Sequence, residues 1–501
     1  MTAGRLAIKN SKPQASLDPL NRALTLSVQL DNEEQKATSL HLIGVAYWRL
    51  NKPEEALRNY QQALAIRRKI GQKRGVALSV NEVGKMQALL GDNKAALSSF
   101  QEALAIRRDI GDKRGLGDSL IDLGNFLDDR GDHDAALKNY KEALQIERDM
   151  GNESLQATCL NNIGAVYFEK AQYEDARTYY QQALQLREKS KVPGDIVNSV
   201  FNLAEVSVRI GEYDQAVAQY MRALDLHRGM DDQRGAAVDS YTLGIMFDYQ
   251  GRFGAAVNSK QDALTTFQNM KDKTTWMADI QGGYGESLVL AGRGEEAKSY
   301  LSDALNLARE LKNDGLVAQT LGFQGDAAYY RGDSKSARAF YDQALQAAAR
   351  SKEPDRILTA KVNLAEVALQ EGQAQPAAAL LRQLMQQADE QGVPNVSVEC
   401  QIYMAEAMIR GRDNAHAQQE LGRALLRADK IGLKPLSARA HFLLGTVLRE
   451  SGTQADAQQE YRNTLNLLDD MRKEPGADKI LQRSDFKAMY DEATRWSQAK
   501  S

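Results

Sequence analysis

The fold is decided by one stretch, residues 84–123, which reads GKMQALLGDNKAALSSFQEALAIRRDIGDKRGLGDSLIDL. It reads as a helix, a Gly-Asp turn, a second helix and another Gly-Asp turn. Most of the chain repeats this pattern every 40 residues, with a single step of 41. A fixed period of this size indicates a solenoid, in which each repeat packs against its neighbours.

Small residues occupy three positions of the repeat. The first column holds Gly44, Gly84, Gly124, Gly164, Ala204, Gly244, Gly285, Gly325, Ala365, Ala405 and Gly445. Twelve residues further on, the second column holds Ala56, Ala96, Ala136, Ala176, Ala216, Ala256, Ala297, Ala337, Ala377, Ala417 and Ala457. A third column is alanine from Ala63 to Ala344 and then frays at Gln383 and Thr464. Small residues at fixed offsets let two helices approach closely, so we expect one helix pair per repeat.

Larger residues accompany these columns. A large apolar residue precedes the first column, and an aromatic residue stands between the second and third columns at Tyr60, Phe100, Tyr140, Tyr180 and Tyr220. This pattern resembles the tetratricopeptide repeat (TPR). The resemblance implies an all-α fold, a right-handed superhelical solenoid of antiparallel helix pairs. It also implies that the first helix of each pair lines a concave groove that binds a protein or peptide.

The length of the repeat and two sequence signatures indicate which classes of TPR protein this chain resembles. The common TPR is about 34 residues long, whereas the 40-residue form resembles repeats of bacterial signalling proteins, of spindle-orientation adaptors and of rapsyn. The lysine and asparagine pattern by which chaperone-binding TPRs clamp a carboxylate is missing. The Leu-Gly-Asn signature of the spindle adaptors occurs only around Gly124-Asn125.

Counting back from Gly44 places Gly4 in the first column, so the chain begins within a repeat. We expect residues 1–36 to be a truncated first repeat that supplies the second helix of an incomplete unit. Residues 37–477 are expected to form eleven TPR units, and residues 478–501 a C-terminal capping helix. The whole array is expected to be a single elongated body.

The period is interrupted once, at residues 271–285. One extra residue enters there, and Gly282, Gly283 and Gly285 cluster within a predicted helix, where each glycine costs about 1 kcal/mol relative to alanine. Two explanations stay open: a hinge in the array, or a close backbone contact between repeats.

Composition excludes several classes of function. The chain has 64 Lys and Arg against 67 Asp and Glu, and a net charge of −3 gives no case for nucleic acid binding. No apolar run approaches the roughly 18 residues of a membrane span. We therefore expect no membrane insertion within this chain and a cytoplasmic location, or an extracytoplasmic one if a longer protein has an upstream span. The oligomeric state is not predicted.

No motif supports catalysis. Residues 117–120 match the nucleophile block of one lipase and esterase family, but Ser119 shares its column with Ser79 and Cys159 inside a predicted helix. The five histidines never pair at helical spacing, so neither a metal nor a cofactor is predicted. Cys159 and Cys400 are expected to be separate core residues. We expect a chain that is not an enzyme.

Arginines crowd the last turns of the second helices, as in Arg67, Arg68, Arg107 and Arg108. A cation there stabilises the negative helix end. A phosphate-binding ridge is the alternative interpretation.

The candidate binding surface is the concave groove formed by the first helices. Its candidate residues are Asn125, Asp128, Glu205, Asp248, Glu286, Asp326, Glu366 and Glu406. Five of the acidic members stand directly after the first column and would form a row, which favours a basic or donor-rich partner: Glu205, Glu286, Asp326, Glu366 and Glu406. The alternative is a solvated helix face, supported by Glu406 and Arg410, which are four residues apart and can pair within one helix.

These observations predict a non-catalytic TPR scaffold that binds a protein or peptide, as the regulatory or sensory region of a larger bacterial signalling protein. Two alternatives stay open. The chain could be the non-catalytic part of a Ser/Thr kinase or CHAT-type protease, or an adaptor of the spindle-orientation type.

The small columns should carry the stability of the array. We expect Ala103→Glu to bury a charge between two helices and to lower the free energy of unfolding by several kcal/mol, on the order of 3–5. Because neighbouring repeats stabilise one another, the loss should spread beyond one repeat. A thermal melt followed by circular dichroism measures it, and an unchanged melt would mean that the proposed helix register is wrong.

Overall fold

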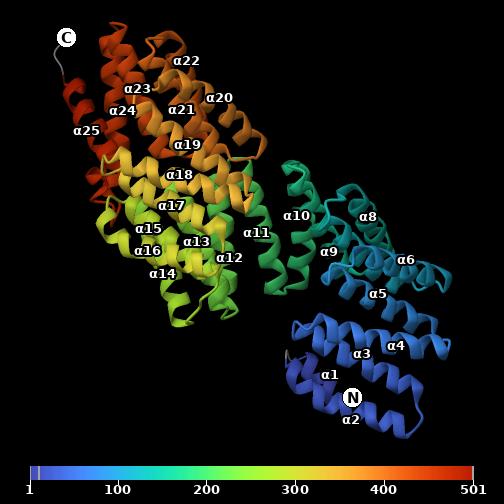
Figure 1. Cartoon of the computed structure of the whole chain (residues 1–501). Helices are drawn as coiled ribbons and strands as arrows, with labels where there is room; N and C mark the ends of the chain where they lie inside the picture. Colours follow the sequence, from blue (N-terminus) through green and yellow to red (C-terminus); the bar gives the residue numbers. More distant parts are fainter. Residues whose placement is uncertain (1, 10–11, 499–501) are drawn as a thin grey trace. The chain divides into compact units, whose positions relative to one another are not determined.

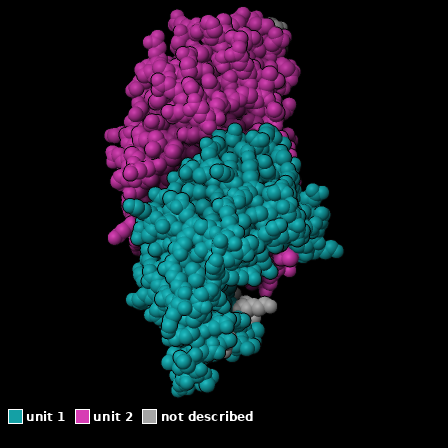
Figure 2. All heavy atoms as spheres, turned by 90° about the vertical axis from the view of Figure 1, so that its right-hand side faces the viewer, with its two compact units in different colours: residues 1–191 teal, residues 192–501 magenta. Residues whose placement is uncertain are grey.

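The computed structural model describes residues 2–9 and 12–498, and all regular structure within them is helical. Consecutive helices pack as antiparallel pairs (Figure 1), which confirms the all-α TPR architecture. The helices gather into two compact units, residues 1–191 and 192–501, coloured separately in Figure 2. The constant repeat length predicted a single elongated body. The structure instead divides into two compact units after Lys191. The backbone of Lys191 is left-handed, with a φ of 56°.

The helices of unit 1 are α1 (Thr2–Lys9), α2 (Pro13–Gln29), α3 (Glu33–Arg49), α4 (Pro53–Lys69), α5 (Lys73–Leu89), α6 (Asn93–Asp109), α7 (Lys113–Asp128), α8 (His133–Asp149), α9 (Glu153–Glu169) and α10 (Tyr173–Ser190). The first repeat contains more than its second helix. Residues 2–9 form α1, which occupies the place of the last turns of a first helix and packs against α2.

The helices of unit 2 are α11 (Pro193–Arg209), α12 (Tyr213–Gly229), α13 (Gln233–Tyr249), α14 (Phe253–Asn269), α15 (Thr275–Leu290), α16 (Gly294–Glu310), α17 (Asp314–Tyr329), α18 (Ser334–Ser351), α19 (Pro354–Gln370), α20 (Ala374–Glu390), α21 (Pro394–Arg410), α22 (Asn414–Ile431), α23 (Lys434–Glu450), α24 (Gln454–Lys473), the 3₁₀ turn η1 (Ile480–Gln482) and α25 (Ser484–Ser497).

The Gly-Asp dipeptides end one helix and begin the next. Gly91 has a positive φ of 81°, a left-handed conformation that costs glycine little because it has no Cβ. The carboxylate of the next residue, Asp92, accepts a hydrogen bond from the backbone N–H of Ala95 at 3.2 Å. This bond satisfies one of the free N–H groups at the start of α6. The predicted turns are therefore confirmed.

Within a repeat, the first-column glycine packs against the aromatic ring 16 residues later. A Cβ added to Gly44 would lie 2.7 Å from the ring of Tyr60, and one added to Gly164 would lie 2.7 Å from the ring of Tyr180. Every alanine of the second column is 3% exposed or less. The predicted small columns are therefore the contact surface of the helix pair.

The arginines at the ends of the second helices bind the next repeat. Arg67 is buried and donates to the Ser79 hydroxyl at 2.7 Å, from α4 to α5. Arg68 pairs with Glu102 at 2.6 Å. The predicted pairing at the helix end thus extends to partners in the following repeat, and contacts within the protein occupy these side chains.

The structure also shows the surroundings of Ser119 and of the two cysteines. Ser119 is buried in α7 and donates to the amide oxygen of Asn81 at 2.6 Å, so it occupies no exposed nucleophile turn. Cys159 and Cys400 are buried free thiols, as predicted.

The interruption at residues 271–285 does not break a helix. α15 runs without a gap through the glycine cluster. A Cβ added to Gly283 would lie 2.6 Å from the ring of Tyr241, and one added to Gly285 would lie 2.6 Å from Leu301. Close packing therefore explains both of these glycines.

The C-terminal segment does more than cap the stack. The predicted capping helix of residues 478–501 begins only at Ser484, because residues 474–483, here called the tail, return to the middle of unit 2; residues 499–501 lie outside the described part. Glu474 accepts a hydrogen bond from the backbone N–H of Gly254 at 2.9 Å. The backbone N–H of Ser484 donates to the carbonyl of Tyr330 at 2.8 Å. α25 itself packs on α24 and α23.

The tail fits closely over Gly254 in α14, where an added Cβ would collide with the carbonyl oxygen of Pro475. We expect Gly254→Ala to displace the tail and to accelerate tryptic cleavage after Lys479, since the helices themselves gain no clash. Gly294→Ala is the matched control, because its Cβ would meet no atom within 4 Å. Equal cleavage rates in both variants, measured by mass spectrometry, would contradict the seating of the tail.

Candidate functional site

Unit 2 contains a cavity of about 480 Å³. The first helices of successive repeats form most of its wall, from α13 to α23, and Arg483 and Phe486 complete it. Four of the residues predicted for the groove line this cavity, namely Asp248, Glu286, Asp326 and Glu366. The sequence pattern therefore identified four residues that share one cavity wall in unit 2.

Two other predicted residues of unit 2 lie apart from the cavity wall. Glu406 pairs with Arg410 at 2.7 Å in its own helix, as the spacing predicted, and with Arg439 of α23 at 2.8 Å. Glu205 accepts a hydrogen bond from the hydroxyl of Tyr220.

Asn125 and Asp128 belong to unit 1, so they do not join the acidic row. Asn125 is exposed and accepts a hydrogen bond from the Tyr140 hydroxyl at 2.8 Å. An oxygen of Asp128 lies 3.0 Å from Nδ1 of His133, and Glu169 lies 3.7 Å from the same nitrogen. These three groups could hold a cation, but such groups are also common without one, so the expectation of no metal remains a prediction.

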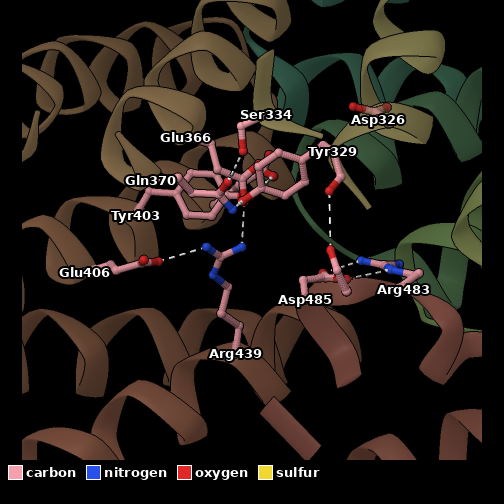
Figure 3. A network of polar contacts seen from close by, with 12 residues as sticks. Asp326, Tyr329, Ser334, Glu366, Gln370, Tyr403, Glu406, Arg439, Arg483 and Asp485 are labelled. Atoms are coloured by element: carbon pink, nitrogen blue, oxygen red, sulfur yellow. Dashed lines mark hydrogen bonds and ion pairs between the residues drawn. The ribbon is translucent and has the colours of Figure 1, made fainter. Parts of the chain in front are cut away.

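Cations from within the protein partly neutralise the acidic row. Lys260 is fully buried, and its Nζ lies 2.7 Å from Asp248 and 3.3 Å from Glu286. Arg439 bridges Glu366, at 2.6 Å, and Glu406 (Figure 3). Glu366 is only 7% exposed, so the interpretation of the row as a solvated helix face is wrong for this residue.

A second kind of contact holds three further carboxyl groups. Tyrosine hydroxyls donate to Asp326 at 2.7 Å (from Tyr341), to Asp279 at 2.8 Å (from Tyr241) and to Glu399 at 3.0 Å (from Tyr403). A neutral hydroxyl leaves the negative charge in place, so these groups lack the close ion pair that Glu366 makes with Arg439.

Burial therefore shifts the protonation of these groups. Loss of hydration raises the pKa of Asp326 to about 8, and the neighbouring carboxylates of Glu286, Glu366 and Glu399 add to the rise. Burial and Glu366 raise the pKa of Glu399 to about 7. Burial also raises the pKa of Asp279 above its usual range. The cavity thus holds several carboxyl groups that take up protons near neutral pH.

Sequence reasoning missed several residues of the cavity. Asp279 and Glu399 stand six residues before the first column, a repeat position for which the pattern predicts no place in the groove. Lys260 occupies the position held by Tyr220 in the preceding repeat. A lysine in a column of rings was a detectable signal, because it places a cation where the helix pair is otherwise apolar.

Two protein-family models match this chain over its helical repeats. The tetratricopeptide repeat model matches residues 2–69, 75–149 and 122–189, and the model described as the MalT-like TPR region matches residues 163–472. The chain belongs to the MalT-like TPR region family. No curated protein matches its sequence significantly. None of the described helices combines the length and the apolar character that crossing a membrane requires.

Solved structures show a more distant likeness to this MalT-like TPR region. The apo form of the quorum sensor NprR from B. thuringiensis matches 61% of this chain and 85% of its own, at 17% identity and a TM-score of 0.46. The apo form of RapI matches 55% and 99%, at 18% identity and a TM-score of 0.42. A Rap protein complexed with competence and sporulation factor matches 76% and 99%, at 14% identity and a TM-score of 0.44. At these low TM-scores they assign no partner to this chain.

The raised pKa of Asp326 predicts a pH dependence of stability. A usual Asp pKa is about 4, so the folded protein binds more protons than the unfolded one between that value and about 8. The free energy of unfolding should therefore fall as the pH rises through this range.

Asp326→Asn removes this proton and keeps an acceptor for Tyr341. We expect its melting temperature to fall less between pH 5 and pH 8.5 than that of the wild type. Asp303→Asn on the exposed side of α16 should leave the fall unchanged. The same pH profile in wild type and Asp326→Asn would contradict the assignment.

Proposed function

We propose that this chain is a non-catalytic TPR module that binds a protein or peptide partner in the cavity of unit 2. It would serve as the regulatory or sensory region of a larger bacterial signalling protein. The observation that carries the proposal is that the first helices of successive repeats bring Glu286, Asp326 and Glu366 to one cavity wall.

The cavity has the size and composition of a recognition site. Protein ligand sites occupy about 300–1,000 Å³ and combine apolar walls with a few convergent polar groups. Here Phe323 and Tyr249 supply apolar surface beside the carboxyl groups, and the volume of about 480 Å³ suits a short segment of a partner. The buried state of Ser119 supports a role without catalysis.

Filling the cavity tests the proposal. Gly322 lies in α17 on the cavity wall, and a Cβ added there would meet no atom within 4 Å. We expect Gly322→Trp to project its indole into the cavity and to abolish partner capture, because the volume that the partner needs is then occupied.

The measurement is quantitative mass spectrometry of proteins and peptides retained from a lysate of the source cell. Gly422→Trp on α22 is the matched control, because Gly422 also has no atom within 4 Å of an added Cβ and is not part of the cavity wall. A partner retained by Gly322→Trp, or lost equally in both variants, would contradict binding in this cavity.

A further inference from the structure

The cavity of unit 2 contains more acidic than basic groups. Seven carboxyl groups line it: Asp248, Asp279, Glu286, Asp326, Glu366, Glu399 and Asp485. Four cations reach it: Arg356, Arg439 and Arg483 on the wall, and Lys260 through its contact with Asp248. Three negative charges therefore remain when every group is ionised.

Each cation of the cavity lies near one or more carboxyl groups, and two carboxyl groups have no cation within ion-pair distance. Lys260 pairs with Asp248 and Glu286, and Arg483 pairs with Asp485 at 2.7 Å. Arg439 pairs with Glu366 and, outside the cavity wall, with Glu406. Arg356 lies near Asp279, lowering its pKa against the effect of burial. Among the described residues, neither Asp326 nor Glu399 has a cation within 4 Å.

Acceptors on the same wall lack donors. Asp248 is only 6% exposed and lines the cavity, yet its Oδ1 accepts no hydrogen bond from any described residue. The amide oxygen of Gln319, also on the wall, is buried without a donor. A buried acceptor without a donor costs roughly 1–3 kcal/mol. A ligand rich in N–H groups would remove this cost.

The resident arginines show how this wall holds a guanidinium group. Arg439 lies 4.4 Å from the ring centre of Tyr403 while it pairs with Glu366. Arg483 lies 3.8 Å from the ring centre of Tyr330 while it pairs with Asp485. In both cases a carboxylate holds the edge of the guanidinium and an aromatic ring covers its face, the arrangement that favours arginine over lysine.

We infer that the cavity binds a peptide segment with two adjacent arginine side chains, whose guanidinium groups pair with Asp326 and Glu399. This inference rests on the proposed function and names the chemistry of its ligand. The two positive charges offset most of the excess of three negative charges, and the ten N–H groups of two guanidiniums supply donors for the unpaired acceptors.

Binding should release protons. Burial and neighbouring carboxylates raise the pKa values of Asp326 and Glu399, so a guanidinium bound against them would return both groups to the ionised form. The affinity for such a ligand should therefore increase from pH 6 to pH 8.5, whereas simple surface attraction would change little over this range.

The test uses the capped dipeptide acetyl-Arg-Arg-amide and its neutral counterpart acetyl-citrulline-citrulline-amide, titrated calorimetrically into the full chain. We expect the arginine peptide to bind at least tenfold more tightly than the citrulline peptide at pH 8, and at least fivefold more tightly at pH 8.5 than at pH 6. Both peptides are titrated into the wild-type chain, so this comparison does not depend on the folding of a variant.

A pair of matched variants locates the site. Asp326→Asn with Glu399→Gln keeps both acceptors for the tyrosine hydroxyls and should weaken binding of the arginine peptide at least tenfold. Asp303→Asn with Glu310→Gln, at exposed positions of α16, should leave it unchanged.

Equal binding of the two peptides, no binding of the arginine peptide at millimolar concentration, or equal loss in both variant pairs would each overturn the inference. Those results would leave the proposed function in place if Gly322→Trp still abolished partner capture. Capture that is insensitive to Gly322→Trp would instead remove the proposed function itself.

Discussion

The architecture depends on the contact between a backbone and a ring inside each repeat. Because Gly44 has no side chain, the ring of Tyr60 lies directly against the first helix, and the same contact recurs at Gly164 and Tyr180. This contact holds the two helices of a pair at a constant separation. With the separation fixed, each first helix presents the same face inward, and equivalent positions of successive repeats meet on one wall.

One part of the acidic wall of unit 2, at Asp248 and Glu286, departs from this rule. At Gly244 the neighbour 16 residues later is Lys260, whose methylene groups fill the space of the ring while its Nζ reaches Asp248 and Glu286. Burying charges in this way is expensive, and apolar residues would give a similar or greater stability. Stability alone therefore does not explain the buried charges on this cavity wall.

Periodic features were predictable from the sequence, and non-periodic ones were not. The Gly-Asp turns, the small columns and the inward row at Glu286, Asp326 and Glu366 all follow from the 40-residue repeat, because the same local contacts recur. The contact of the tail with Gly254 depends on the superhelical twist that accumulates over many repeats. The sequence of a single repeat does not determine that accumulated twist. The pairing of Arg439 with Glu366, 73 residues apart, has the same origin.

The end of the tail forms part of the cavity wall. Arg483, at the end of the tail, lies on the cavity wall, where its guanidinium covers the ring of Tyr330, and Ser484 bonds to the carbonyl of that same tyrosine. A ligand in the cavity would contact groups that are in place only when the tail is seated. Binding must then stabilise the seated tail by the same free energy by which the seated tail strengthens binding. The C-terminal segment thus supplies a part of the cavity wall that the repeats themselves do not supply.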